Sequence, residues 1–157
     1  PLLTLNALSL GLCPEEEYDR VNEEGFSVLD DDIHLVFRAI KEADALVLAS
    51  PIFFGSLSAQ VKTMIDRFQC VWLAREKLKK EIFSKSIRGA FICVEATERK
   101  DFFDNAKSIV RHFFATANVE YGRELLCGGV DDRGKVLERP ECLEAAYRIG
   151  RDIATLQ

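Results

Sequence analysis

The sequence has few of the patterns that mark metal, phosphate or nucleotide sites. Its two histidines, His34 and His112, fall within predicted helices, and no CxxC or HExxH pattern accompanies them. No GxGxxG or GxxxxGK[ST] pattern occurs, so dinucleotide-fold and P-loop interpretations have no positive support. We therefore assign no metal ligand and no catalytic side chain from the sequence.

Long apolar runs and an excess of positive charge are also lacking. No apolar run reaches the roughly 18–20 residues that cross a bilayer, and no charged-then-apolar signal sequence opens the chain, so no membrane association is expected. A net charge of −5 gives no general attraction to nucleic acid. The five cysteines are an odd number at scattered positions, and Cys70 and Cys93 stand in apolar surroundings. This usage favours a reducing cytoplasm.

The apolar content and its periodicity predict a single α/β domain over residues 1–157. Of these residues, 48% are hydrophobic, which suffices for a full core. Apolar runs predict strands at 45–49, 87–94 and 119–126. Helical periodicity predicts helices over 33–40, 58–78, 101–117 and 140–153. The alternation of strands and helices implies a central parallel sheet with helices on both faces.

The segment between the first predicted strand and the long helix is the most informative. We expect Pro51 to stop the strand ladder, Gly55 to permit backbone conformations closed to other residues, and Ser58 to cap the helix. Ligands of open α/β sheets bind beyond the C-terminal ends of the strands. Residues 50–57 lie there and are aromatic and apolar, which suits a flat conjugated ligand.

The stretch SPIFFGSLSAQVK at 50–62, followed by Ile65-Asp66-Arg67, resembles the flavin loop of the flavodoxin-like NAD(P)H-dependent oxidoreductases. The subgroup most similar to it is the iron–sulfur flavoproteins and their relatives without the cluster. Supporting matches are Asp31-Asp32 and the C-terminal stretch that begins at Gly129-Val130. The resemblance implies a flavodoxin-like three-layer sandwich, FMN as cofactor, NADH or NADPH as electron donor, and dimers or tetramers.

The candidate FMN-binding residues come from two segments. The resemblance assigns the first segment, which comprises Ser50, Pro51, Ile52, Phe53, Phe54, Gly55 and Ser56. The second segment comprises Glu95, Ala96 and Thr97. These three residues follow the second predicted strand, so they could edge the same ligand or form an ordinary exposed loop.

Two functions remain open from the sequence. The first is an FMN-dependent oxidoreductase that passes electrons from NAD(P)H to a small-molecule acceptor such as a quinone or another flavin. In such enzymes the cofactor carries the reaction, so backbone N–H groups of residues 52–57 would stabilise the reduced flavin and no side chain need act as acid or base. The second is a non-catalytic flavodoxin-like domain that acts through oligomerisation or partner binding.

The N-terminal part of the chain departs from the family pattern. A flavodoxin-like sheet has its first strand in the middle, followed by a phosphate-binding loop, and neither is recognisable here. Residues 2–10 stand where the second strand of the family is expected. Either the chain lacks an N-terminal part of the fold, or residues 2–10 replace the central strand.

The cluster motif of the iron–sulfur flavoproteins is absent as well. That motif needs four closely spaced cysteines, because thiolates ligate the irons. Only Cys13 stands in the corresponding region, while Glu16 and Asp19 occupy the positions expected for further cysteines. We therefore expect no iron–sulfur cluster.

The predicted 58–78 helix also indicates a homo-oligomer. It is longer than one sheet crossing needs, and Phe68, Val71, Trp72 and Leu73 place apolar residues on more than one of its faces.

Overall fold

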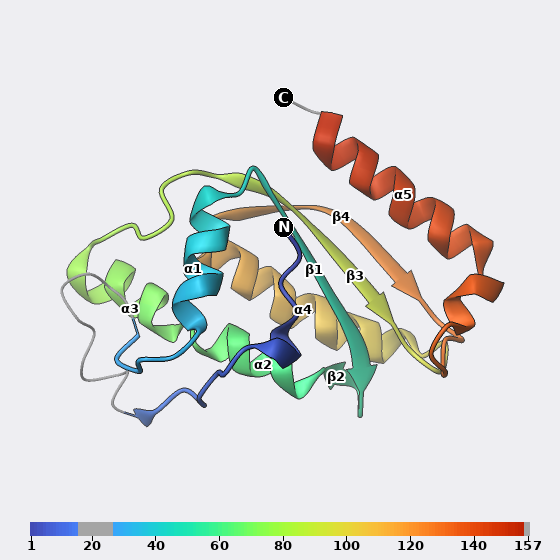
Figure 1. Cartoon of the computed structure of the whole chain (residues 1–157), viewed down its shortest axis with the longest axis horizontal. Helices are drawn as coiled ribbons and strands as arrows, with labels where there is room; N and C mark the ends of the chain where they lie inside the picture. Colours follow the sequence, from blue (N-terminus) through green and yellow to red (C-terminus); the bar gives the residue numbers. More distant parts are fainter. Residues whose placement is uncertain (16–26, 156–157) are drawn as a thin grey trace.

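A four-stranded sheet forms the centre of the molecule in a computed structural model that describes residues 1–15 and 27–155 (Figure 1). The strand order is β2-β1-β3-β4. β1 (Ala45–Phe53), β3 (Ile87–Val94) and β4 (Val119–Cys127) run parallel, and β2 (Ser56–Leu57) pairs antiparallel with the end of β1. The predicted α/β fold with a mainly parallel sheet is therefore confirmed, while the assignment of 1–157 to one domain stays a prediction.

The helices cover both faces of this sheet. The five α-helices are α1 (Ile33–Glu42), α2 (Ala59–Asp66), α3 (Gln69–Leu78), α4 (Lys100–Thr116) and α5 (Pro140–Thr155). Two short 3-10 helices, η1 (Leu5–Ala7) and η3 (Lys135–Glu138), complete the described elements. α5 lies on the opposite side of the sheet from α4 (Figure 1). Among the described residues, no helix is both long and apolar enough to cross a membrane.

The core lies between the sheet and α1, α3 and α4, and it is rich in phenylalanine. The Phe68 ring meets Phe37 and Phe113 edge-on, both at 4.8 Å between ring centroids, and stacks on Phe83 at 5.8 Å. Such aromatic pairs add to the hydrophobic gain of burial. Because these rings come from α1, from α4, from the junction of α2 and α3 and from the loop before β3, they fix the helical layer against the sheet.

The predicted helix over 58–78 is wrong in one respect, because it is broken into α2 and α3. The break lies at Arg67 and Phe68. Arg67 keeps helical backbone angles, Phe68 (φ −78°, ψ 1°) leaves the helical range, and Phe68 N donates to Ile65 O as in a tighter turn. The break aims the two side chains differently. Phe68 enters the aromatic core, while the fully buried Arg67 pairs with Asp31 and donates to Gly11 O at 3.0 Å.

Residues 2–10 do not replace the central strand, because none of them forms a strand. Part of this segment is η1, and Leu8 and Leu10 pack against the core. Ser9 N donates to Asp32 Oδ2 at 2.7 Å, which ties the segment to the start of α1. No strand precedes β1 in the described parts of the chain, so from Ala45 to Pro51 the second edge of β1 has no strand partner there.

Two of the five cysteines form a disulfide, which their scattered positions in the sequence did not indicate. Cys127 at the end of β4 forms a disulfide with Cys142 in the first turn of α5. Cys70 and Cys93 are buried, as their apolar surroundings predicted. The cytoplasmic location inferred from cysteine usage stays a prediction.

Candidate functional site

Three chain segments come together at the C-terminal edge of the sheet. Ser50 is in register with Cys93, and Val94 is in register with Cys127, so the strand ends lie level. Because parallel strands end at one edge, the segments that follow β1, β3 and β4 are neighbours there. The structure therefore brings the two predicted cofactor segments, 50–56 and 95–97, to the same edge of the sheet.

The first segment forms a tight, exposed aromatic turn. β1 continues to Phe53, beyond the predicted end at Ala49, but its ladder with β3 ends at Pro51 as expected. Phe54 and Gly55 both have positive φ, 50° and 75°, which is the backbone of a two-residue hairpin turn. Phe53 is 59% exposed and Phe54 is fully exposed, so this turn presents aromatic surface to solvent.

The N-terminal part of α4 holds this turn in place. Asn105 Nδ2 donates to Gly55 O at 2.7 Å. The Phe102 ring lies against Gly55, so closely that a Cβ on residue 55 would stand 3.0 Å from its carbons. The Arg99 guanidinium covers the same Phe102 ring at 4.1 Å from its centroid. Sequence reasoning missed Asn105 and Phe102, because their link to residue 55 exists only in the folded chain.

Ser50 in the first segment and Ser58 just after it serve the local structure of this site. The buried Ser50 hydroxyl donates to Pro51 O at 2.8 Å and accepts from Ser58 N at 3.1 Å, which joins the two ends of the turn region. Ser58 Oγ accepts from Val61 N, so its predicted role as a helix cap is confirmed. Ser50 therefore stabilises the turn from its buried side.

The second segment divides into a buried and an exposed part. Glu95 is only 3% exposed, and its carboxylate accepts from Arg99 N at 2.6 Å, which closes a short loop. Ala96 and Thr97 are exposed at the tip of that loop. Glu95 is thus a framework residue of the edge, and the loop places Ala96 and Thr97 where a ligand can touch them.

The loop after β3 is bonded to the segment after β4. Glu95 N donates to Cys127 O at 3.0 Å, and Val130 N donates to Glu95 O at 2.8 Å. Gly129, at φ 70°, donates its N–H to Thr97 O at 3.3 Å. These backbone bonds make the two loops one unit.

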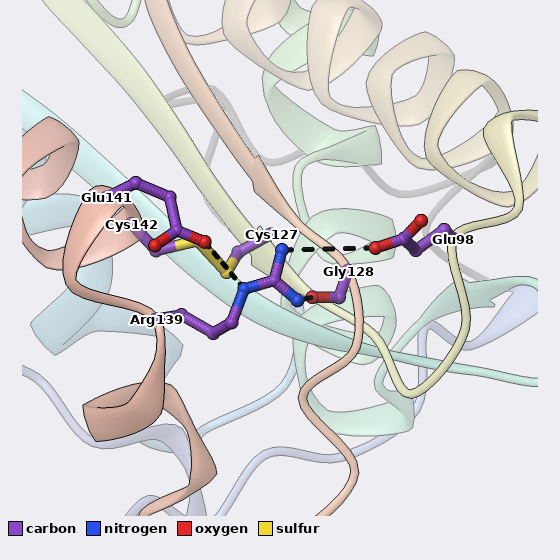
Figure 2. Close-up of a disulfide and its surroundings, with 6 residues drawn as sticks. All are labelled: Glu98, Cys127, Gly128, Arg139, Glu141 and Cys142. Carbon is purple, nitrogen blue, oxygen red and sulfur yellow. Dashed lines mark hydrogen bonds and ion pairs between the residues drawn. A yellow bond between two sulfur atoms is a disulfide. The ribbon is translucent and has the colours of Figure 1, made fainter.

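Arg139 extends that unit to the start of α5. Figure 2 shows its guanidinium between Gly128 and two glutamates. It donates to Gly128 O at 2.9 Å and to Glu141 Oε1 at 2.6 Å, and it forms a long ion pair with Glu98 at 3.9 Å. The hydrogen bond from Arg139 holds the pKa of the Glu141 carboxyl below its ordinary value.

A reactive thiol at Cys93 and a metal site find little support at this edge. Burial, with a smaller contribution from the charge of Glu95, raises the pKa of the Cys93 thiol to about 12, so it stays protonated at neutral pH. In residues 1–15 and 27–155, no group of three His, Cys, Asp or Glu side chains is placed to hold a metal ion. Glu16 and Asp19 lie outside the described residues, and the expected absence of a cluster stays a prediction.

The edge fits the ring system of FMN better than its phosphate. The aromatic turn, with its fixed backbone and exposed rings, matches a flat conjugated group. Across the described ranges, no strand–loop–helix unit precedes β1 to bind a phosphate. The described residues therefore offer a surface suited to a flat ring, and none of them forms a phosphate loop before β1.

Comparison with known proteins also points to FMN. The family model for NADPH-dependent FMN reductases matches residues 2–99. An iron–sulfur flavoprotein of Methanocaldococcus jannaschii is 44% identical over 45 residues, which are 29% of this chain and 23% of that protein. The matched region thus spans about a quarter of that relative.

Solved structures are similar over most of the chain. An NAD(P)H:quinone oxidoreductase from Methanothermobacter marburgensis superposes with a TM-score of 0.64 at 21% identity, covering 92% of this chain and 73% of that one. An FMN-dependent NADH-azoreductase from Bacillus anthracis, solved with FMN, has a TM-score of 0.61 at 16% identity, covering 94% and 79%. At this identity the likeness concerns the fold alone. The family match over 2–99, which is more than half of the chain, shows that the chain belongs to the NADPH-dependent FMN reductase family.

Proposed function

We propose that this chain forms the flavin-ring side of an FMN-dependent oxidoreductase. The observation that carries the proposal is the exposed Phe53–Phe54–Gly55 turn, locked by α4 at the C-terminal edge of the sheet. Membership of the FMN reductase family supports the same cofactor. When bound, FMN supplies the hydride and electron chemistry, taking electrons from NADH or NADPH and giving them to a quinone, a flavin or a similar acceptor.

In this proposal, the chain itself binds and orients the flavin ring. The backbone N–H groups of residues 52–57 face the ring and stabilise negative charge that reduction places on it. Ala96 and Thr97 border the ring from the neighbouring loop, and Phe53 and Phe54 shield it from water. No side chain is needed as an acid or base, which agrees with the protonated state of Cys93.

Purification of the full-length protein tests this function directly. We expect a yellow protein with flavin absorbance, from which heat releases FMN, identified by chromatography. Anaerobic mixing with NADH or NADPH should bleach the flavin band, and a quinone should restore it. A protein that stays colourless and binds no added FMN would favour the second function, a non-catalytic domain that works through assembly.

We propose a homo-oligomer whether the protein is an oxidoreductase or a non-catalytic domain. The break between α2 and α3 removes helix length as a reason for a homo-oligomer, but the apolar surface remains. Trp72 is 41% exposed and lines a groove of about 650 Å³ between these helices and α4, together with Ile65 and Ile109. A second copy of the chain covers this groove in a dimer or tetramer.

Replacing Trp72 with Glu should weaken this assembly, because the change places a charge at a dry contact. Light scattering of the full-length protein over a range of concentrations measures the effect. Leu137→Glu is the matched control, since Leu137 is 73% exposed on η3 and does not line the groove. A mass of one chain at every concentration for the unmodified protein would contradict the proposed assembly.

A further inference from the structure

The Cys127–Cys142 disulfide lies outside residues 2–99, which the family model matches, and it has no part in the proposed electron transfer. It joins the last residue of β4 to the first turn of α5 and closes a segment with a sequence separation of 15. Within that segment, Gly129 N donates to Thr97 O and Val130 N donates to Glu95 O. The disulfide is therefore a covalent anchor next to the candidate site (Figure 2).

The helix on the other side of this anchor is held by little else. Of the sixteen residues of α5, only Cys142 and Ile149 are buried. Leu143 and Tyr147 remain 41% and 72% exposed. With so little apolar area against the sheet, the N-terminal turn of α5 depends on the disulfide and on the Arg139 bonds.

We propose that Cys127 and Cys142 form a redox-modification site, a disulfide that a dithiol reductant opens and that thereby loosens the loop pair 95–99 and 128–139. The other described cysteines are placed differently, since Cys70 and Cys93 belong to the hydrophobic core and the half-buried Cys13 lies in the N-terminal segment. In reducing compartments, disulfides that persist are mostly transient or redox-sensing ones, so the predicted cytoplasmic location agrees with this role.

The exchange reaction proceeds in two steps. A thiolate of the dithiol attacks Sγ of Cys142, which is slightly more exposed than Cys127 (7% against 1%), and the S–S bond breaks so that Cys127 leaves as a thiolate and takes up a proton. The second thiolate of the reductant attacks its own sulfur in the mixed disulfide. Cys142 then leaves and is protonated, and the reductant becomes a cyclic disulfide, so two electrons have passed to the protein.

The position of Cys142 helps this exchange. It lies in the first turn of α5, where the N-terminus of a helix stabilises negative charge on a thiolate. Its backbone N–H donates to Arg139 O at 3.0 Å, so movement of Cys142 is transmitted to the residue that holds Gly128. Reduction therefore acts on the bonds to 95–97 through Arg139.

Thiol counting on the native full-length protein tests the exchange. Both counts are made in denaturant. Within this chain, we expect three titratable thiols for the oxidised protein, and five for protein that was treated with dithiothreitol while native, freed of the reductant and then denatured. Cys13→Ser is the control variant, which should lower both counts by one and leave the difference at two. A disulfide that dithiothreitol reaches only in denaturant is a purely structural bond, and that result would overturn the proposal.

Hydrogen exchange tests the loosening without any flavin. On reduction, the amides of Glu95, Gly129 and Val130 should exchange about tenfold faster or more, while the α2 amide of Lys62 should not change. The Cys127→Ala/Cys142→Ala variant should show the fast rates in both redox conditions. Equal rates before and after reduction in the unmodified protein would contradict the inference.

A lower FMN affinity of the reduced protein would follow as well, but that step rests on the proposed function. If exchange quickens on reduction while FMN never binds, the redox site stands and the cofactor assignment fails. If FMN binds but dithiothreitol changes neither the thiol count nor the hydrogen-exchange rates, the cofactor assignment stands and the redox site fails.

Discussion

α4 and α5 are helices of similar length on opposite faces of one sheet, yet different forces hold them. α4 buries five residues, Phe103, Ala106, Val110, Phe113 and Phe114. α5 buries only two, and one of these is the disulfide residue Cys142. The α4 side is thus held by packing and the α5 side by a covalent bond. The candidate site combines the aromatic turn, which α4 holds in place, with the 128–139 segment, which the disulfide anchors. We therefore expect the turn to be rigid and the 128–139 segment to depend on the disulfide.

Truncation of one aromatic ring on each helix should show the largest difference. Phe113→Ala removes a buried ring that meets Phe68 edge-on, and it should lower the free energy of unfolding by about 3–5 kcal/mol. Tyr147→Ala on α5 should cost less than about 0.5 kcal/mol, because Tyr147 is mostly exposed. Urea unfolding of the oxidised protein measures both. Equal losses would mean that α5 is packed as firmly as α4.

Loss of the disulfide should have the next largest effect. The Cys127→Ala/Cys142→Ala variant should lose about 3 kcal/mol of unfolding free energy, the value expected for a closed segment of 15 residues. Thermal unfolding in the absence of reductant measures this against the unmodified protein. An unchanged midpoint would show that packing, and not the covalent bond, holds α5.

Acid should affect the α4 side through Asp31, which pairs with Arg67 at the break between α2 and α3. Burial opposes ionisation of Asp31, but hydrogen bonds from Arg67, Gly11 N and Ile33 N outweigh it and hold its pKa below the ordinary 3.8. The resulting stability is present above pH 3.8 and is lost as pH falls through the lower folded value.

Removing that carboxylate should abolish its share of the acid response. Asp31→Asn should cost about 2 kcal/mol at pH 7 and show a smaller further loss between pH 4 and pH 2 than the unmodified protein. Urea midpoints across that range measure the difference. Parallel curves for the two proteins would exclude Asp31 as the titrating group.

The sequence predicted the parts of the fold that depend on local pattern. The apolar run at 87–94 coincides with β3, because a strand covered on both faces needs apolar residues throughout. The predicted end of β1 at Ala49 was too early, because the strand continues beyond Pro51 by pairing with β2 after its ladder with β3 has ended. Arg67 broke the predicted long helix through its partner Asp31, which is distant in the chain and leaves no periodic signal.

The candidate site was predictable to the same extent. The position and positive φ of Gly55 followed from turn chemistry and are confirmed. Asn105 and the Cys127–Cys142 pair could not be found, because only the fold brings Asn105 to Gly55 and closes the 15-residue separation of the cysteines. Long-range contacts of this kind carry no spacing rule.

FMN titration of the full-length protein with Gly55 replaced by Val tests the central claim most directly. The added side chain meets the Phe102 ring and strains a backbone at φ 75°, so the turn must shift. Gly150→Val is the matched control, because a Cβ at the exposed Gly150 meets nothing within 4 Å. The account predicts that fluorescence quenching gives at least about tenfold weaker FMN binding for Gly55→Val and unchanged binding for Gly150→Val. Equal FMN affinity in all three proteins would contradict the assignment of this turn to the cofactor.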